Sequence, residues 1–410
     1  MLPLSWRLLY IGTFIPLGII FFILLLIKGC LLWPWTGFVR KFIGKGRERP
    51  LRLLCLAYMT EDNASARHRL YKYLDYINNT DIFFDIKPPA DSAINKKYYI
   101  PWQRKGHFIY FIIVFFRRFA AIWSSPAYDA VFVQREIVSE FFFDPPWLIF
   151  VLRFLNKNII YDVDDCIWML PPHSMRGKSR VFNYLARLRF TWNLRMSRQV
   201  IVSNENLAEY AGKINPVVTI IPTLVDVEHY PVAVHEEKKT VVLGWTGGPG
   251  NLIYLKYIEK PLASLAKKYS ILLRIICSRS ISLDGIKIEF VPWRKDSEAR
   301  NISSFDIGIM PLPDNEYTRG KAGFKILEYM AAGLPSVASP VGVNAKIIEP
   351  GITGYLAESD VQWESALARL IEDHLLRESI GRHARVYVSE KYDYSFWAAT
   401  FTRCIQQSAE

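Results

Sequence analysis

Two lysines and a glutamate within residues 320–335 form the pattern in this chain that is best suited to chemistry. Lys321 and Lys325 stand one helical turn apart, and Glu328 follows in the next turn. An apolar run before them predicts a buried strand, and an Ala-rich segment at about 323–332 predicts a helix. The start of such a helix offers free N–H groups and a positive dipole end to a phosphate. Glu328 could accept hydrogen bonds from paired sugar hydroxyls, although an ordinary α/β unit with solvated side chains would give the same pattern.

A glycine-containing loop, residues 244–251, ends another predicted strand and contains Gly247 and Gly248. Because glycine has no Cβ, such a loop lets the backbone approach a pyrophosphate closely. The spacing is not GxGxxG, so a dinucleotide cofactor is not indicated. A plain tight turn would explain the loop equally well. If both loops end strands of one parallel sheet, however, they share the edge at which open α/β sheets bind ligands.

Three carboxylates, Asp162, Asp164 and Asp165, follow an apolar strand in the first half of the chain. Strand geometry places Asp162 and Asp164 on one face, with Asp165 in the loop beyond. Such a run could bind a metal, but neither a calcium-loop spacing nor a histidine cluster accompanies it. We therefore predict no metal site, and a structural turn or cap is an alternative to a functional role.

Basic residues stand at two further positions. Arg67 and Arg69 open a predicted helix at about 64–77, and Arg135 ends a predicted strand. Guanidinium groups suit a phosphate-bearing acceptor or a pyrophosphate, with a solvated basic face as the alternative. His173 lies in the loop beyond the aspartates, where a lone histidine is more often a bystander than a catalyst.

The elements that must position these residues alternate along the chain. Apolar runs predict two series of strands: 51–57, 129–135, 158–163, 199–204 and 217–222, then 240–245, 271–277, 286–291, 306–311 and 336–338. Helical patterns between them indicate parallel, doubly wound sheets. Two shorter apolar stretches, 108–116 and 147–152, predict core helices, with a surface resting on a bilayer as the alternative.

The run Gly-Lys-Ala-Gly-Phe-Lys-Ile-Leu-Glu-Tyr-Met-Ala, residues 320–331, resembles the donor-binding segment of retaining glycosyltransferases of family 4, also called glycosyl transferases group 1. It is most similar to a bacterial subgroup with a Gly-Lys-x-Gly-Phe-Lys-x-x-Glu-Tyr-Met-Ala motif. The subgroup also carries a Ser-x-Arg-x-Arg run and an Asp-x-Asp-Asp run, as found here at residues 65–69 and 162–165. The resemblance covers about residues 51–405. It implies the GT-B fold, an α/β arrangement of two Rossmann-like domains with doubly wound parallel sheets that face a cleft.

The resemblance also implies roles for individual residues. The donor, a nucleoside diphosphate sugar, would contact Gly247, Gly248, Arg279, Val291, Lys321, Gly323, Phe324, Lys325 and Glu328. Catalysis would involve Asp164, Asp165 and Lys325, and the acceptor would contact Arg67, Arg69, Arg135 and His173. Arg279 and Val291 follow or end predicted strands at the expected nucleobase pocket, although plain surface loops fit them equally well.

One position departs from the wider family. Many members have two glutamates with seven residues between them, and the first contacts the sugar. Here that first position is Gly320, while Glu328 keeps the second. The resemblance therefore implies nucleotide-ribose binding by Glu328, and the identity of the donor sugar does not carry over.

The N-terminal region predicts a membrane anchor. Residues 8–27 contain no charge and are long enough to cross a hydrocarbon core of about 30 Å. A cleaved signal peptide and a lipoprotein site at Cys30 are the alternatives; the first lacks a cleavage motif, and Lys28 disfavours the second. Six basic residues follow the span between residues 40 and 52, against Arg7 alone before it. The positive-inside rule then predicts a single pass with the catalytic part in the cytoplasm. The resemblance to a bacterial subgroup implies that the membrane is a bacterial inner membrane.

Charge supports a membrane partner. Residues 1–220 contain 29 Lys and Arg against 16 Asp and Glu, so the whole excess of the +12 net charge lies in this half. A basic surface suits an anionic membrane or nucleic acid, but no nucleic-acid-binding motif accompanies it, so we expect no nucleic acid. The five cysteines show no CxxC spacing, which disfavours a disulfide framework and a metal.

These observations predict four segments: an anchor and basic linker at 1–50, an acceptor domain at 51–225, a donor domain at 226–390 and a tail at 391–410 that crosses back to the first domain. The predicted function is retaining transfer of a hexosyl group from a nucleoside diphosphate sugar to a lipid-linked or cell-envelope glycan acceptor, without a cofactor. The alternative is a catalytically silent membrane scaffold that binds nucleotide sugar. A hydrolase or epimerase is disfavoured, because no Walker or dinucleotide fingerprint is present.

Overall fold

The computed structural model describes residues 23, 24, 27, 49–77, 81–95, 97, 104–138, 148–174 and 180–410. The predicted membrane span at 8–27 lies outside these residues, except for Ile23, Leu24 and Ile27. Among the helices of the described ranges, none is both long enough and apolar enough to cross a membrane.

The first domain is built on a parallel sheet in the order β2-β1-β3-β4-β5-β6. Its strands are β1 (Leu51–Leu56), β2 (Ile82–Lys87), β3 (Ala130–Gln134), β4 (Ile159–Val163), β5 (Gln199–Val202) and β6 (Val218–Ile220). Helices α2 (Ala64–Arg69), α3 (Ser92–Ile94), α4 (Arg104–Ser124), α5 (Leu148–Leu155), α6 (Arg180–Met196) and α7 (Glu205–Gly212) connect them. The helix predicted at 64–77 is interrupted, because Leu70 leaves helical geometry and a 3₁₀ turn, η1 (Tyr71–Asp75), follows.

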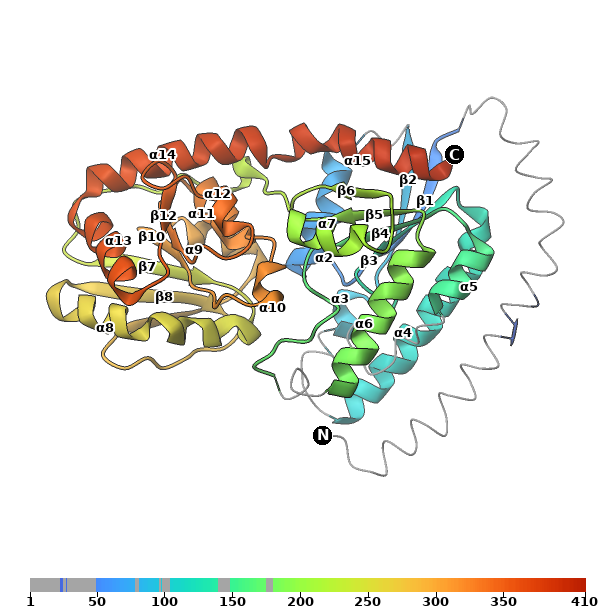
Figure 1. Cartoon of the computed structure of the whole chain (residues 1–410), viewed down its shortest axis with the longest axis horizontal. Helices are drawn as coiled ribbons and strands as arrows, with labels where there is room; N and C mark the ends of the chain where they lie inside the picture. The colour runs from blue at the N-terminus through green and yellow to red at the C-terminus, as the bar shows by residue number, and fades with distance from the viewer. Residues whose placement is uncertain are drawn as a thin grey trace.

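The second domain repeats the design with the order β12-β11-β10-β7-β8-β9. Its strands are β7 (Val241–Thr246), β8 (Ile271–Cys277), β9 (Ile288–Pro292), β10 (Ile307–Met310), β11 (Ser336–Ala338) and β12 (Gly354–Leu356). Its helices are η5 (Pro249–Ile258), α8 (Glu259–Lys268), α9 (Glu298–Ile302), α10 (Glu316–Arg319), α11 (Phe324–Ala331), α12 (Asn344–Ile347), α13 (Asp360–Glu372) and α14 (His374–Lys391). The molecule therefore has two Rossmann-like α/β domains, as predicted (Figure 1).

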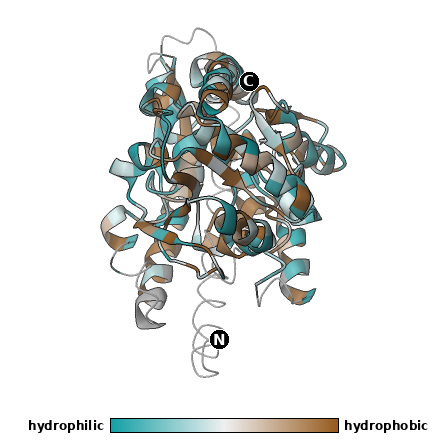
Figure 2. Ribbon diagram, turned by 90° about the vertical axis from the view of Figure 1, so that its left-hand side faces the viewer, coloured by the Kyte–Doolittle hydropathy of each residue, from teal (hydrophilic) through white to brown (hydrophobic). Residues whose placement is uncertain are grey.

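The central strands are buried on both faces. Every residue of β3, β4, β5 and β10 is buried, and their sequences are almost continuously apolar. This is the expected pattern for a parallel strand that is covered by helices on both sides. Figure 2 shows apolar strands enclosed by helices whose outer turns are more hydrophilic. Because crossover connections return each strand in the same direction, all carboxyl ends of one sheet lie at one edge.

The C-terminal helix returns to the first domain. Helix α14 packs on α11 and α13, and α15 (Tyr394–Ala409) packs on β1, β3 and β4. The two helices follow one another along one side of the molecule (Figure 1). At the centre of this contact the Phe401 ring stacks on Tyr73, with centroids 4.0 Å apart, and meets the edge of Phe132. The chain end thus holds both domains together by apolar packing.

Replacing Phe401 by alanine is expected to destabilise the first domain. The ring is 1% exposed, and removing such a buried aromatic ring costs about 3–5 kcal/mol through lost burial and a residual cavity. Urea unfolding followed by tryptophan fluorescence measures the change. Phe396→Ala, on the same helix but 65% exposed, is the matched control and should shift stability by less than about 0.5 kcal/mol. Equal effects of the two substitutions would contradict the packing described here.

Candidate functional site

A cleft of about 540 Å³ lies between the two domains. First-domain residues on its wall are Tyr58, Asp62, Asn63, Ala64, Ser65, Arg135, Asp164, Asp165 and Thr223, and second-domain residues include Thr246, Gly247, Gly248, Asn251, Ser278, Trp293, Glu298, Lys321, Gly323, Phe324, Lys325 and Glu328. Most of these residues lie in the segments that follow strands or at the start of the next helix. The cleft thus joins the carboxyl edges of both sheets, the usual ligand position in open α/β folds.

Gly323 fixes the start of α11. Its φ of +68° is a left-handed conformation, and a Cβ there would lie 2.6 Å from Ile347 and 2.9 Å from Val343. Only glycine accommodates both the dihedral and the close packing. The helix therefore begins at Phe324, and this helix start lines the cleft together with Lys321 and Lys325. Such a helix start favours an anion.

Lys325 packs directly beneath the glycine loop. A Cβ on Gly247 would lie 2.7 Å from Lys325 Cε, and the ammonium group sits 5.5 Å from the centre of the Trp245 ring. Burial, with the nearby charge of Lys321 as a second cause, lowers the pKa of Lys325 to about 8. Two like charges that are kept close and partly desolvated attract an anion strongly. The predicted loop and the predicted helix start therefore form one site.

Glu328 lies on the second turn of α11 and is 3% exposed. The Tyr230 hydroxyl donates a hydrogen bond to its Oε1 at 3.0 Å. Burial first, and the charge of Glu298 second, raise the pKa of Glu328 to about 8. A buried carboxylate of this kind gains from ligand hydroxyls that donate hydrogen bonds to it.

Glu298 was not predicted from the sequence. It begins α9, and its carboxylate accepts hydrogen bonds from Arg67 Nη2 at 2.5 Å and from the Trp293 indole at 2.7 Å. Arg67 comes from α2, so this buried ion pair bridges the two domains. Glu298 stands among charged residues in a short helix, which in sequence resembles a solvated surface. No local signal reveals it, because its partner is 231 positions away.

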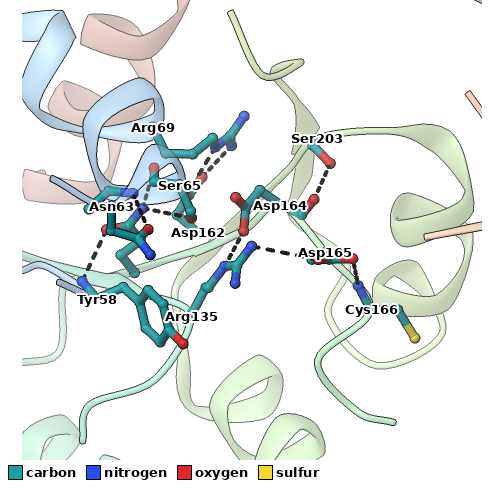
Figure 3. Close-up of polar contacts among 12 residues, drawn as sticks. Tyr58, Asn63, Ser65, Arg69, Arg135, Asp162, Asp164, Asp165, Cys166 and Ser203 are labelled. Carbon is teal, nitrogen blue, oxygen red and sulfur yellow. Dashed lines mark hydrogen bonds and ion pairs between the residues drawn. The ribbon is translucent and has the colours of Figure 1, made fainter. Parts of the chain in front are cut away.

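The predicted aspartates occupy the opposite wall. Arg135 directs its guanidinium between Asp164 and Asp165, with an ion pair to Asp164 and a 3.8 Å approach to Asp165 (Figure 3). Burial acts to raise the pKa of Asp164, but the Arg135 charge outweighs it and lowers that pKa. Arg135 has a φ of +55°, the only positive φ of a non-glycine residue in the described ranges. Strained backbone of this kind is often found at functional sites.

Arg69 lies away from the cleft. It is 2% exposed and pairs with the fully buried Asp162, and its Nη1 donates to the carbonyl oxygens of Ile221 and Pro222. Burial opposes its charge, yet Asp162 outweighs this effect and raises the pKa of Arg69. Arg69 therefore ties α2 to β4 and to the start of the interdomain connection.

The remaining predicted residues are not all brought together. Arg67 is buried against Glu298 and does not line the cleft. Arg279 is exposed beyond the lining residue Ser278, and Val291 is partly buried against the core of the second domain. His173 is exposed and meets the edge of the Tyr254 ring at 5.6 Å. Sequence spacing found the correct loops here but not the side chain in each loop that faces the cleft.

Possible metal ligands are not grouped in the part of the chain that the structure describes: no three His, Cys, Asp or Glu side chains converge there in a way that could hold an ion. The positive charge in the cleft comes instead from Arg135, Lys321 and Lys325.

Two Rossmann-like domains that face each other across such a cleft define the GT-B fold. Residues 260–373 match the family model described as "Glycosyl transferases group 1". The structure is similar to that of sucrose-phosphate synthase from Thermosynechococcus elongatus, with a TM-score of 0.65 and 15% identity, covering 88% of this chain and 99% of that one. HepE from Anabaena, solved with UDP and glucose, is similar with a TM-score of 0.59 and 14% identity, covering 87% of this chain and 100% of that one.

A glycosyltransferase from Rickettsia africae gives a TM-score of 0.58 at 12% identity, covering 88% of this chain and 99% of that one. A search of curated proteins finds no match to the chain. At these identities the similarity to solved structures shows the fold, and the family match covers a segment of the second domain that includes α11.

Replacing only Arg69 in the buried Arg69–Asp162 ion pair should destabilise the protein more than replacing both residues. Arg69→Met leaves Asp162 buried without a partner, which costs about 3–5 kcal/mol, whereas the double variant Arg69→Met/Asp162→Leu should recover most of that loss. Chemical unfolding of the three proteins measures the coupling. If Arg69→Met leaves stability unchanged, the conclusion that Arg69 ties α2 to β4 is wrong.

Proposed function

We propose that this chain is a membrane-anchored glycosyltransferase that moves a hexosyl group from a nucleoside diphosphate sugar to an acceptor with retention of anomeric configuration. The observation that carries the proposal is the convergence of Lys321, Lys325 and the α11 start on the Gly247 loop, with Glu328 one turn further on. The family match at residues 260–373 includes α11. Retention, and membership of the family 4 subgroup, rest on the resemblance of the sequence motif.

The donor's diphosphate is best accommodated at the start of α11. Positive charge there comes from the two lysines and the helix dipole, and Gly247 permits close approach of the backbone. Glu328 would accept hydrogen bonds from the nucleotide ribose, and Ser278 and Trp293 lie where the base would enter. UDP and glucose occupy the similar structure from Anabaena, which supports a nucleotide-sugar donor here.

Transfer breaks the bond between the sugar C1 and a diphosphate oxygen, and negative charge develops on that oxygen. Lys321, Lys325 and the helix N–H groups would stabilise this charge, so we propose transfer without a metal or cofactor. An acceptor oxygen forms the new bond to C1, oriented by Asp165 with Asp164 behind it. Its proton passes to the leaving diphosphate, which lies on the same face of the sugar in a retaining transfer.

We further propose that residues 1–50 form the anchor and place the two domains on the cytoplasmic side of a bacterial inner membrane. The uncharged span at 8–27 and the basic residues after it support this location. An anionic membrane surface would then be a partner, and the acceptor would be a lipid-linked or cell-envelope glycan.

Nucleoside diphosphates are expected to raise the melting temperature of the protein, since a ligand that binds only the folded state stabilises it by mass action. A panel of uridine, guanosine, adenosine and cytidine diphosphates, free and as sugar conjugates, tests this by thermal shift. Lys325→Met should lower the affinity for the tightest-binding ligand by about tenfold or more, because a charge-assisted hydrogen bond is lost.

The matched control is Lys268→Met on the exposed end of α8, which should leave the affinity within about twofold of the parent. Release of nucleoside diphosphate with transfer to an added glycan would support the enzyme. Binding without turnover would support the catalytically silent scaffold instead. An absence of any diphosphate binding would contradict both the enzyme and the scaffold hypotheses.

The pH dependence of diphosphate binding should report the ionisation of Glu328, whose pKa is raised by the neighbouring carboxylate of Glu298. In the empty protein the pKa values of Glu328 and Lys325 both lie at about 8, so binding should strengthen as pH rises towards 8, when Glu328 ionises, and weaken above it, when Lys325 loses its charge. Glu298→Gln removes the neighbouring charge and lowers the pKa of Glu328. The rising limb should therefore move to lower pH, with several-fold tighter binding at pH 6.5.

Calorimetric titrations between pH 6 and 9 measure this shift. Glu289→Gln, at a partly exposed carboxylate on β9 that pairs with Arg274 and does not line the cleft, is the matched control for a change in overall charge. Phosphate ionisation affects all three proteins equally and cancels in the comparison. An identical profile for the parent and Glu298→Gln would remove Glu328 from the proposed ribose site.

A further inference from the structure

The wall of the cleft that faces the donor site is acidic. Among the described residues of the first domain that line it, the charged side chains are Asp62, Asp164, Asp165 and Arg135, three carboxylates against one guanidinium. This is opposite to the overall charge of the first half of the chain, which carries all of the excess of basic residues. Among the described residues of this domain, the basic ones are therefore not concentrated at the place where an acceptor would react.

In the part of the domain that the structure describes, the arginines closest to this wall are already neutralised within the protein. Arg135 serves Asp164 and Asp165, and its guanidinium also lies 5.1 Å from the centre of the Tyr58 ring. Arg67 pairs with Glu298 and Arg69 with Asp162, and neither lines the cleft. Freeing any of these guanidinium groups for a ligand would leave a buried carboxylate unpaired, at a cost of several kcal/mol.

The lysines on the second-domain wall of the cleft are expected to bind the donor and not the acceptor. Lys321 and Lys325 belong to the second domain, where the diphosphate of a donor would use their charges. Lys325 is partly buried and packs beneath Gly247, so reaching across the cleft would cost this packing. A second phosphate, on the acceptor, would meet the donor diphosphate and the acidic wall together. Like charges placed side by side in this way cost several kcal/mol.

We propose that the acceptor unit that enters the cleft is an uncharged sugar, and that the new glycosidic bond forms to one of its hydroxyl oxygens and not to a phosphate oxygen. This inference rests on the proposed glycosyl transfer. Sugar hydroxyls donate hydrogen bonds, which carboxylates accept, whereas a phosphate dianion has no donor to offer. Asp62 and Asp165 provide acceptors, with Asn63 and Ser65 as further polar groups at the start of α2.

The geometry at Asp165 identifies it as the principal acceptor contact. Asp164 is committed to Arg135 and is 5% exposed, while the Asp165 side chain is 25% exposed and approaches Arg135 only at 3.8 Å. The Asp165 Oδ1 accepts a hydrogen bond from the Cys166 N–H, which fixes the carboxylate at the cleft wall. Asp164 then acts as a positioning residue through Arg135.

This assignment indicates which class of reaction must come before this one. A lipid phosphate would not itself be the acceptor, so a different class of reaction, transfer of a sugar phosphate or sugar to a lipid phosphate, must act earlier. Its product carries a neutral sugar that can enter the cleft while the charged phosphates of the lipid stay outside. Alternatively, any hydroxyl-bearing glycan at the membrane surface satisfies the same chemistry.

The test compares matched acceptors on the full-length protein with a saturating nucleoside diphosphate. The probes are a neutral methyl hexoside, the same hexoside with a 6-phosphate, and a short-chain polyisoprenyl phosphate, and the readout is ligand-observed NMR binding. Transfer from the donor sugar to the same three compounds is measured in parallel. We expect the neutral hexoside to bind and react at least tenfold better than either phosphate. Asp62→Asn should reduce this preference roughly threefold or more, because one repelling charge is removed.

Glu209→Gln, which removes an exposed carboxylate outside the cleft lining, is the matched control and should keep the preference unchanged. Equal or better binding of a phosphate acceptor would overturn the inference while leaving glycosyl transfer intact. Because the NMR experiment measures acceptor binding and needs no turnover, it tests the acceptor preference even if the protein is catalytically silent. A protein that binds no nucleoside diphosphate would refute the proposed function itself, and the inference with it.

Discussion

The left-handed backbone at Gly323 is the constraint on which the rest of the site depends. It ends the preceding loop so abruptly that α11 begins within the cleft, and the side chains of Ile347 and Val343 leave no room for a Cβ. The helix start then places Lys325 under Gly247 and Glu328 against Tyr230. Burial follows from this packing, and burial is the main cause of both shifted pKa values. One dihedral thus links chain geometry to the electrostatics of the site.

The same segment is also connected to the other domain. Glu298 raises the pKa of Glu328 and at the same time binds Arg67 of α2, and the neighbouring His68 ring packs on Phe324 at 4.3 Å. His68 in turn contacts the Tyr394 hydroxyl at the start of α15. A ligand that changes the ionisation of Glu328 therefore acts on a network that reaches the helix joining the domains. Contacts of this kind connect occupancy of the cleft to the relative position of its walls.

Local signals predicted most of the fold, and distant contacts account for what they missed. Continuous apolar runs identify β1, β3, β4 and β8, because buried parallel strands have few polar positions. The partly exposed strands β2 and β12 lack that pattern and were not predicted. In the site, motifs located α11 and the aspartates, but Glu298 depends on Arg67, which is 231 positions away. Spacing also could not show that Arg69 turns inward to Asp162, since α2 is only six residues long.

The inward turn of the arginines explains the chemistry of the acceptor wall. Three guanidinium groups of α2 and the end of β3 each pair with a carboxylate: Arg69 with Asp162, Arg135 with Asp164, and Arg67 with Glu298. The basic motif of the sequence therefore forms ion pairs within the protein. Among the described first-domain residues at the surface of the cleft, the charged side chains left outside these pairs are Asp62 and Asp165. Arginines that look in sequence like phosphate ligands instead hold carboxylates in fixed positions. A rigid, acidic wall opposite two lysines separates the two substrates by charge, with the diphosphate on one side and hydroxyl groups on the other.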